Sequence, residues 1–408
     1  IRDRRSQGQG GRQRPMTYIL RRKSVILLIC IFFAGFIGPA LMGGHPSDVV
    51  GAPFARPVWW NSQLPLSSEY SVGNDGAVIE WKKLPPEIFA LNGKITADPG
   101  SRVRIIWSTT EGDMLLDTLE GSGIYWINMD GRDMIFKQKL GLPLIGKSTE
   151  HLFPSNGRYE IRIEGASETD LILSLPGGRQ GLLGTDQRGR DILTLLIYGI
   201  RTSLTVGISA TLIASLLGLG LGLATGYIGG WFDSAVMRAV DVLLSIPTLP
   251  IMMVLAGLWG KGLWQLVLIL SIFSWMGTAR SVRALVLTVR ESPWVEGLRA
   301  LGAGRGYILW RHLVPEAAPI LLANVALGVP GAILAEAGLA FLGLSDPRLI
   351  SWGRMLHEAH SFGAFTEGAW WLLVPPGLGI VALCLIFMDI GRYLEEKIDP
   401  RLGSAKNA

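Results

Sequence analysis

Apolar residues in this 408-residue chain gather into six long runs, separated by segments in which charged and polar residues return. Each run has about 18 residues or more, enough to cross ~30 Å of hydrocarbon at about 1.5 Å of rise per helical residue. The runs lie near Val25–Met42, Leu204–Tyr227, Val242–Trp259, Leu263–Val289, Ile320–Leu342 and Trp371–Ile390. This pattern predicts six transmembrane helices. The first is expected to remain as an uncleaved anchor, because its run exceeds the usual ~7–15 residues of a signal-peptide core and no A-x-A cleavage site follows.

The block between the first two runs, residues 45–182, has a different period. In Arg158–Glu164 apolar and charged residues alternate, which is typical of a half-buried strand. The same alternation is present at Val103, Ile105 and Trp107 and again at Leu171, Leu173 and Leu175. Turn-forming sequences separate these stretches, and Asn74-Asp75-Gly76 is a hairpin signal. Several short strands at this spacing predict a small β-sandwich.

The distribution of charge predicts on which side of the membrane each segment between the apolar runs lies. Only 17% of the residues are charged and 49% are hydrophobic, whereas an average soluble domain has roughly 25% charged residues, which argues against a simple soluble enzyme. Residues 1–23 contain eight basic residues and one acid, and residues 45–190 contain 15 basic and 18 acidic residues. The positive-inside rule then predicts cytoplasmic termini, cytoplasmic loops at 228–241 and 290–319, and an outside location for residues 45–190. No basic face on a folded domain suggests a nucleic-acid partner.

Two patterns resemble ligand sites and are not expected to be such. Residues 141–148 read GLPLIGKS and match the phosphate-loop pattern. That motif needs a helix directly after it, and Pro154, Asn156 and Gly157 leave no room for a long one. His357 and His360 are three residues apart and could share a helix face, but no third metal ligand is evident. We therefore expect neither nucleotide nor metal binding by this chain.

A short motif after the fourth apolar run carries the functional signal. Residues 295–303 read VEGLRALGA, and Pro315 follows in the sequence Leu313-Val314-Pro315. Small residues at Gly297, Ala300, Gly302 and Ala303 would let a short helix enter a groove of a partner. Leu298 and Leu301 could provide an apolar anchor, Arg299 and Arg305 could pair with acids of a partner, and Gly302 could end the helix in a left-handed turn. Taken alone, the same residues suit an ordinary cytoplasmic loop with positive-inside arginines equally well.

This motif resembles the E-A-A-x-x-x-G loop in the membrane subunits of ATP-binding-cassette (ABC) importers. Glu296, Gly302 and Pro315 match that loop, and Gly297 and Leu298 stand where the family has two alanines. Further matches follow in family order, and the whole set resembles the C-type permease of dipeptide, oligopeptide and nickel importers. They include LGTDQRGRD at 183–191, SIP at 245–247, RHLVP at 311–315, AEAGLAFLGL at 335–344 and DPRL at 399–402. The resemblance covers residues 183–402 densely and does not extend to the β block.

The resemblance implies an all-α polytopic membrane protein of the type I ABC importer permease fold, with six transmembrane helices and an inserted extracytoplasmic β-sandwich-like domain. The expected parts are a cytoplasmic basic tail at 1–23, a first transmembrane helix at 24–44, the insert at 45–182, a permease core of five transmembrane helices at 183–402 and a cytoplasmic tail at 403–408. The ATPase-coupling loop is expected at 290–315, with Glu296, Gly297, Leu298, Arg299, Ala300, Leu301, Gly302, Ala303 and Pro315. A family interface motif is expected at Gly184, Thr185, Asp186, Gly189, Arg190 and Asp191, on a helix at the outer membrane interface that an Asp or Thr caps.

The resemblance also implies partners. They are a second homologous permease subunit, two cytosolic ATPase subunits (or one fused ATPase) and an extracytoplasmic substrate-binding protein. ATP and Mg would be bound by the ATPases and no cofactor by this chain, which would lie in a bacterial cytoplasmic membrane and import di- or oligopeptides or similar small solutes. Glu336, in the fifth apolar run, is interpreted either as a pathway or gate residue or as a buried hydrogen-bonded residue that sets helix packing. Asp241 is expected to cap the third span.

Two other classes of function would suit a chain with membrane spans and a β block. A membrane-anchored extracytoplasmic binding or sensory module would make the β block the working part, but it would not need the permease motifs. An ion-coupled transporter would be expected to have paired intramembrane charges and two related halves, and the sequence has no such internal repeat.

Overall fold

The computed structural model describes residues 15–398 of the chain, which form two compact units. The helical unit contains residues up to Gly43, Leu196–His360 and residues from Leu373 onward; the β unit contains Gly44–Leu195 and Ser361–Leu372. Each unit is described by itself. Most of the predicted tail at 1–23 and all of the predicted tail at 403–408 lie outside the described residues.

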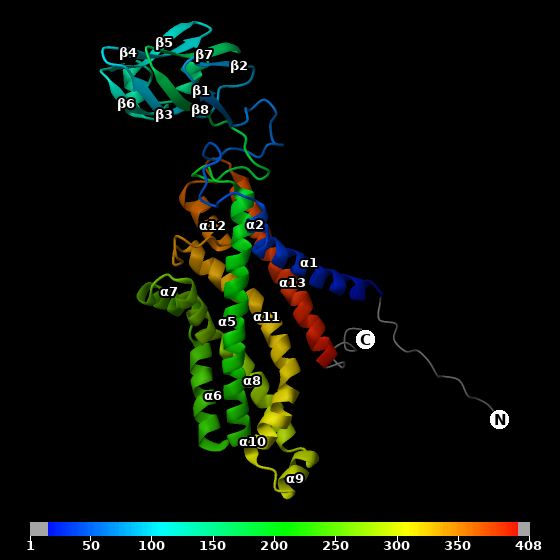
Figure 1. Ribbon diagram of the computed structural model, residues 1–408. Helices are drawn as coiled ribbons and strands as arrows, with labels where there is room; N and C mark the ends of the chain where they lie inside the picture. Colours follow the sequence, from blue (N-terminus) through cyan, green and yellow to red (C-terminus); the bar gives the residue numbers. More distant parts are fainter. Residues whose placement is uncertain (1–14, 399–408) are drawn as a thin grey trace, which may run out of the picture. The chain divides into compact units, whose positions relative to one another are not determined.

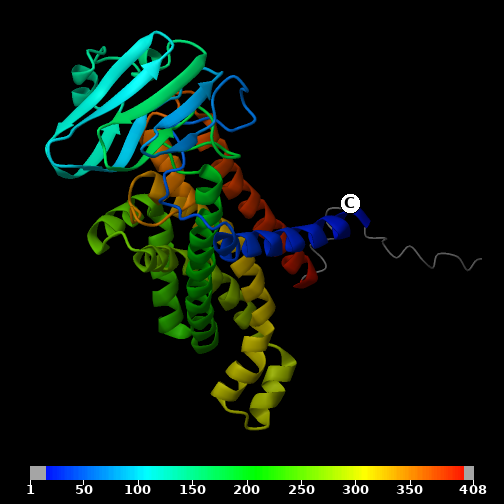
Figure 2. The same ribbon diagram turned by 45° about the horizontal axis from the view of Figure 1, so that its top comes forward.

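The β unit is built on two four-stranded antiparallel sheets that face each other (Figures 1 and 2). The strand orders are β1-β8-β3-β6 and β2-β7-β4-β5. The strands are β1 (Ser68–Val72), β2 (Ala77–Trp81), β3 (Ala90–Ala97), β4 (Arg102–Thr109), β5 (Gly112–Glu120), β6 (Gly123–Asp130), β7 (Gly157–Glu164) and β8 (Glu168–Leu175). Two short helices, α3 (Met134–Lys139) and α4 (Thr149–Leu152), connect β6 to β7.

The predicted alternation of apolar residues is confirmed in three strands. The apolar positions of β4 and β8 that the sequence singled out are all buried, as are Tyr159 and Ile161 of β7. They meet in one core between the sheets, where the Trp107 ring lies 5.7 Å from the Tyr159 ring and 5.3 Å from the Phe153 ring. The Trp107 indole N–H donates to the Leu152 carbonyl at 2.9 Å, so the buried polar end of this large side chain is satisfied. The expectation of a sandwich-like insert agrees with this architecture.

The turn expected at Asn74-Asp75-Gly76 is present, but it does not join two strands of one sheet. These residues do form a turn, in which the Gly76 N–H bonds the Gly73 carbonyl at 2.9 Å. The turn joins β1 to β2, however, and these strands belong to different sheets, since β1 pairs with β8 and β2 pairs with β7. The residues of the turn make the chain reverse direction. Which strands then pair is determined by the apolar side chains that the two sheets bury between them.

The phosphate-loop pattern at 141–148 has none of the geometry of a phosphate site. The helix after it, α4, spans only four residues. The Lys147 ammonium pairs with the Glu87 carboxylate. The loop turns its carbonyls inward, where Lys137 Nζ donates to the carbonyls of Leu144 and Gly146 at 3.2 and 2.6 Å. A phosphate would need amide N–H groups at this position.

The helical unit consists of packed helices of very different length (Figure 1). Helix α13 packs along α11, α1 packs on α13, and α8 contacts α6, α7 and α11. The long helices are α1 (Pro15–Phe36), α5 (Ile192–Ile228), α6 (Gly230–Ser245), α7 (Thr248–Trp259), α8 (Leu263–Arg290), α11 (Val314–Phe341) and α13 (Val374–Ile398); the short ones are α2 (Gly38–Leu41), α9 (Pro293–Ala300), α10 (Arg305–Ile308) and α12 (Trp352–Ser361). Gly222 and Gly226 of α5 let that helix approach α8 closely, because a Cβ at either position would lie within 2.8 Å of α8 atoms.

Four described helices are long and apolar enough to cross a membrane. They are Ile192–Ile228, Leu263–Arg290, Arg305–Phe341 and Trp370–Glu396, where the last two are continuous helical stretches that include short non-α turns. Helices α6 and α7 pass the same test only as a pair, which gives five spans at most. The apolar part of α1 within the described residues, Lys23–Phe36, is shorter than the length required. The predicted total of six spans is therefore not reached by this criterion.

The span expected near 242–259 is divided between two helices, and most of the connection expected at 228–241 is helical. Residues 230–245 are helical as α6, and the chain bends by 91° between α6 and α7. Pro247 explains the bend, because proline lacks a backbone N–H and disfavours helical backbone in the residue before it. Ile246 is accordingly extended, with φ −94° and ψ 134°. Asp241 lies inside α6 and pairs with Arg280 of α8, so it does not cap a helix as expected.

Candidate functional site

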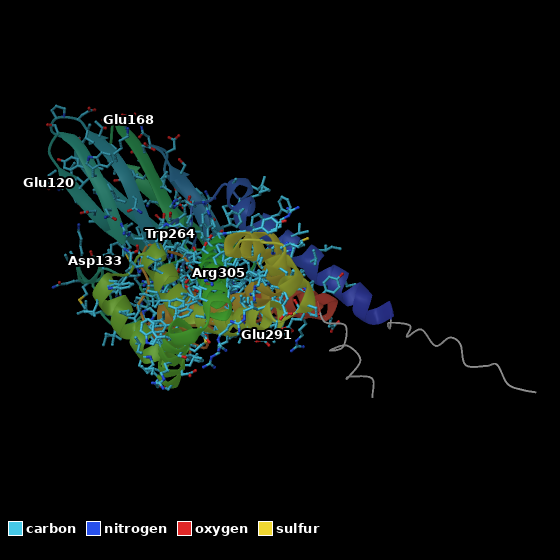
Figure 3. The ribbon with its side chains drawn as sticks, turned by 90° about the horizontal axis from the view of Figure 1, so that it is seen from below. Glu120, Asp133, Glu168, Trp264, Glu291 and Arg305 are labelled. Atoms are coloured by element: carbon cyan, nitrogen blue, oxygen red, sulfur yellow. The ribbon has the colours of Figure 1, made fainter. Side chains whose placement is uncertain are left out.

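The connection between α8 and α11, residues 291–313, is a compact helical elbow in the helical unit, seen end-on in Figure 3 with Glu291 and Arg305 labelled. Helix α9 begins after Ser292, whose backbone is extended and whose hydroxyl donates to the Val289 carbonyl at 2.5 Å. Pro293 occupies the first helical position, where a missing N–H costs nothing. Glu296 lies in the first turn, where the helix dipole stabilises a negative charge.

The predicted left-handed end of this helix is confirmed. Gly302 has φ +83°, its N–H bonds the Arg299 carbonyl at 3.0 Å, and the Ala303 N–H bonds the Leu298 carbonyl at 3.0 Å. These two bonds form a Schellman motif, which satisfies the last carbonyls of α9. The helix therefore has a sharply defined end and turns at once toward α10.

One face of α9 belongs to the core of the helical unit. Val295 is fully buried in a cluster with Val282 and Val286 of α8 and Leu313, and Leu298 packs against the same cluster. Leu298 is half-buried against this cluster, so only part of its side chain is left for the partner contact that the sequence predicts. Positions 295 and 298 are three residues apart on a helix and share a face, and that face is already covered. Leu301 lies beyond the helix end and is 86% exposed.

The opposite face of α9 is exposed and includes several small residues. Glu296, Gly297, Arg299, Ala300 and Gly302 are all exposed. A Cβ added to Gly297 or Gly302 would meet no atom within 4 Å. The Arg299 guanidinium lies over the Tyr227 ring at 5.6 Å from its centroid. Among the described residues, Glu296 and Arg305 form no ion pair, so their charges are available to a partner.

The same elbow contains exposed aromatic residues that the sequence patterns did not single out. The His312 ring lies 5.5 Å from the Trp294 ring and 5.6 Å from the Tyr307 ring. Trp294, Tyr307 and Trp310 are exposed large side chains. Large aromatic side chains in a charged connection between two spans were the available signal, since such residues are enriched where proteins bind one another.

Pro315 lies at the start of α11, directly after a π-helical turn at Leu309–Leu313. The Val314 N–H bonds the Leu309 carbonyl, which is the wider spacing of a π-turn. Proline at 315 has no N–H to donate to the turn before it, which accounts for the irregular helix at this point. The elbow is thus joined to α11 through a continuous but locally widened helix.

Glu336 is buried in α11, with 1% of its side chain exposed. Its Oε2 atom is buried without a hydrogen-bond partner among the described residues. Its immediate neighbours along the helix belong to two apolar clusters, with Ile333 and Ala337 in one and Ala332 and Leu339 in the other. Both interpretations of Glu336, as a pathway or gate residue and as a residue that sets helix packing, stay predictions.

The predicted family interface motif at 184–191 lies in the β unit and forms a loop, so the expected helix is wrong. Thr185 Oγ1 donates to the Ala52 carbonyl at 2.6 Å and accepts the Ala55 N–H at 2.8 Å. These contacts tie the loop to residues 52–55 of the insert, a tertiary partner that local sequence does not reveal. The Gly184 carbonyl accepts the Ile192 N–H at 3.1 Å, and the Gly189 carbonyl accepts the N–H groups of Val50 and Gly51 at 2.9 and 3.2 Å.

Two acids complete this loop. Asp186 accepts the backbone N–H of Arg190 at 2.9 Å and pairs with its guanidinium at 2.5 Å. Asp191 accepts the Thr194 N–H and hydroxyl, each at 2.8 Å, which makes it the cap of α5. The cap was expected on a separate interfacial helix, whereas Asp191 caps the long helix α5.

Within residues 15–398, no group of three or more His, Cys, Asp or Glu side chains could hold a metal ion. His357 Nδ1 contacts the Phe341 carbonyl at 2.6 Å, and the His360 ring lies 5.4 Å from the Phe341 ring. The elbow has one buried face, one exposed face and a helical connection to the long helices α8 and α11.

Comparison with known proteins identifies the helical part of the chain. The family described as "Binding-protein-dependent transport system inner membrane component" matches residues 218–400. A putative peptide permease protein of Brucella suis biovar 1 (strain 1330) is 37% identical over 219 residues, which is 53% of this chain and 72% of the relative. The dipeptide transport system permease protein DppC of Bacillus subtilis (strain 168) is 36% identical over 230 residues, 56% of this chain and 71% of the relative.

A glutathione transport system permease protein of Pectobacterium atrosepticum is 34% identical over 223 residues, 54% of this chain and 73% of the relative. Among solved structures, an inward-facing MetNI methionine ABC transporter chain is 21% identical, with a TM-score of 0.39 over 49% of this chain and 95% of that chain. The extent and identity of the matches to the relatives establish the family: the chain belongs to the binding-protein-dependent transport system inner membrane components, and it is a permease subunit of an ABC importer of the peptide family.

Proposed function

We propose that this permease pairs with a second homologous permease subunit to form the pathway for di- or oligopeptides or similar small solutes. The names of the relatives, which include peptide, dipeptide and glutathione permeases, support this substrate class. An extracytoplasmic substrate-binding protein delivers the solute. Two cytosolic ATPase subunits, or one fused ATPase, bind ATP and Mg and drive the cycle.

In the proposed topology the chain has the type I ABC importer permease fold, with six spans in a bacterial cytoplasmic membrane, both termini in the cytoplasm and residues 45–190 outside. Eight basic residues among the first 23 support a cytoplasmic N-terminus. Arg290, Arg299, Arg305 and Arg311 around the elbow support the same side for that connection. The bent pair of α6 and α7 then counts as one broken span, and α1 counts as the first.

The elbow is proposed to couple the ATPases to the membrane helices. The observation that carries this proposal is the two-sided character of α9, with Val295 buried against α8 and an exposed small-residue face opposite to it. A partner groove that received Gly297, Ala300 and Leu301 would push on a helix already packed against α8. Movement of the ATPases would therefore pass to α8 and α11 as rigid-body motion through packed contacts.

A charge placed at the exposed tip of the elbow tests this coupling. Leu301→Asp removes no core contact, because the side chain is exposed in this chain. In proteoliposomes that contain the importer with its ATPases and binding protein, we expect the association of the ATPases to weaken at least roughly tenfold, which requires only about 1.4 kcal/mol. ATP-dependent uptake should fall accordingly.

Ile145→Asp is the matched control, because Ile145 is a similarly exposed apolar residue in the insert. It should leave uptake and ATPase association unchanged. Full uptake by Leu301→Asp, with normal membrane insertion, would refute the coupling role of the elbow.

A further inference from the structure

Three exposed tryptophans form one cluster on the β unit. The ring centroids of Trp59 and Trp60 lie 5.9 Å apart, and the Trp370 ring lies 6.1 Å from the first and 5.6 Å from the second. The exposed fractions are 58% for Trp59, 45% for Trp60 and 36% for Trp370. Two of these indoles come from the insert, which has no counterpart in the family motifs, and the third comes from the connection before α13.

The position of Trp370 along the chain places the cluster at a membrane boundary. Trp370 is the first residue of the apolar helical stretch Trp370–Glu396, one of the four described stretches that are able to cross a membrane. The first residue of a span lies near the level of the lipid headgroups, where tryptophan is enriched because its ring is apolar and its N–H is polar. Since Trp59 and Trp60 contact Trp370, they must lie at the same level.

The cluster is held in shape by buried polar contacts beneath it. The Arg179 guanidinium is buried and donates to the carbonyls of Val58, Ser62 and Leu64 at 2.7, 3.3 and 2.8 Å, which pins the loop that carries Trp59 and Trp60. The Trp59 indole N–H donates to the Leu182 carbonyl at 2.8 Å. The surface is therefore preformed and does not depend on a flexible loop.

The chemistry of the cluster fits a lipid interface. The three tryptophans are uncharged. Further exposed apolar side chains lie in the chain segments that contact Trp59 or lead to Trp370; they are Leu182, Phe362 and Phe365. Within the described residues, the indole N–H groups of Trp60 and Trp370 have no hydrogen-bond partner, so each can bond a lipid carbonyl or phosphate oxygen. A charged solute would find no opposite charge among the three indoles.

We propose that Trp59, Trp60 and Trp370 form an anchor by which the base of the insert rests in the headgroup region of the leaflet on the insert's side. This inference depends on the crossing of the membrane by residues 370–396, and it does not depend on the coupling role of the elbow. The competing occupant is a protein surface, such as the substrate-binding protein.

Tryptophan fluorescence in proteoliposomes distinguishes the two occupants. The assembled importer is reconstituted in phosphatidylcholine with or without bromine atoms on the upper part of the acyl chains, and the intensity quenched by the brominated lipid is measured. Trp59→Phe with Trp60→Phe keeps aromatic packing while removing two fluorophores. We expect this variant to lose lipid-quenchable intensity relative to the wild type.

Trp126→Phe is the matched control, because Trp126 is 80% exposed on β6 of the same unit and lies outside the cluster. It should remove intensity that aqueous iodide quenches and leave the lipid-quenchable intensity unchanged. The proposal is overturned if the intensity lost with Trp59 and Trp60 is quenched by iodide and not by brominated lipid. Protection from iodide that appears only after addition of the binding protein would overturn it in favour of a protein partner.

A second probe leaves the cluster intact, in case the double variant is poorly folded. Ser62 is exposed two residues after Trp60, and a nitroxide label on a cysteine at this position reports its surroundings. We expect collision with oxygen, which is concentrated in lipid, to exceed collision with a water-soluble nickel reagent when compared with a label at Asp75, an exposed residue of the β1–β2 turn. Equal accessibility at the two positions would contradict the anchor.

Discussion

Gly302 and Gly297 permit a matched test of how the elbow is built. Both glycines are exposed on α9 or at its end, and an added Cβ at either position would meet no atom within 4 Å. They differ in backbone conformation, because Gly302 has φ +83° whereas Gly297 lies within the right-handed helix. The same substitution, glycine to alanine, should therefore have opposite effects at the two positions.

The magnitudes follow from the backbone alone, since no packing changes. An L-residue in the left-handed region costs about 1–2 kcal/mol, so Gly302→Ala should favour local opening of the elbow by about 5- to 30-fold. Alanine in place of glycine within a helix stabilises it by about 0.5–1 kcal/mol, so Gly297→Ala should reduce local opening by about 2- to 5-fold.

Amide hydrogen exchange on the importer in lipid nanodiscs measures this opening directly. The Ala303 amide is the informative one, because its N–H bonds the Leu298 carbonyl across the helix end at 3.0 Å. Its exchange should become faster in Gly302→Ala and slower in Gly297→Ala. Amides in the middle of α8 serve as an internal control and should not change.

A change of the same sign in both variants, or no change in either, would refute the backbone argument. Transport provides an independent readout. If the partner groove requires the low relief of Gly297, then Gly297→Ala will lower uptake although it stabilises the helix. A loss of uptake together with slower exchange would therefore point to docking and not to helix stability.

The remaining predictions concern topology and the cap of α5. A cysteine at exposed Asn156, in a chain whose two native cysteines are replaced, should react with an impermeant thiol reagent in intact cells, whereas a cysteine at exposed Arg305 should react only after permeabilisation; the reverse pattern would contradict the proposed orientation. Asp191→Ala removes the acceptor of the Thr194 N–H and should cost about 1 kcal/mol, seen as roughly fivefold faster exchange of the Thr194 amide. Asp191→Asn keeps an acceptor and should exchange nearly as the wild type does.

Local periodicity predicted the elements that are governed by one buried face. The apolar positions of β4, β7 and β8 were identified from alternation, and the structure buries them in one core. The predicted span at 263–289 coincides with α8, which runs from Leu263 to Arg290. The end of α9 at Gly302 was predicted because only glycine adopts a left-handed turn without cost.

The incorrect predictions lie where a residue distant in sequence or a single proline determines the local structure. The loop at 184–191 is held by carbonyls of residues 52 and 55 and by Trp371, whose indole N–H lies 3.4 Å from the Thr185 carbonyl. Nothing within the loop itself indicates these partners. The break between α6 and α7 could have been predicted from Pro247. The hydropathy averaged over a long apolar run, however, does not reveal the effect of a single proline.

Burial also decides which apolar residues of the elbow are free. Leu298 and Leu301 look equivalent as sequence, and three-dimensional packing separates them, since only the first contacts the core around Val295. The hydropathies of Trp294 and Trp310 would suit the end of a transmembrane span as well as a partner-binding surface. Their exposure in the elbow is visible only in the structure.

Photocrosslinking from position 301 tests the central claim most directly. A benzophenone amino acid replaces Leu301 in the assembled importer, and the same amino acid at Ile145 is the control, because both side chains are exposed. The account predicts an adduct with the ATPase subunit from position 301, altered in yield by ATP, and none from position 145. Absence of an ATPase adduct from position 301, in an importer that retains its ATPases and transports solute, would contradict it.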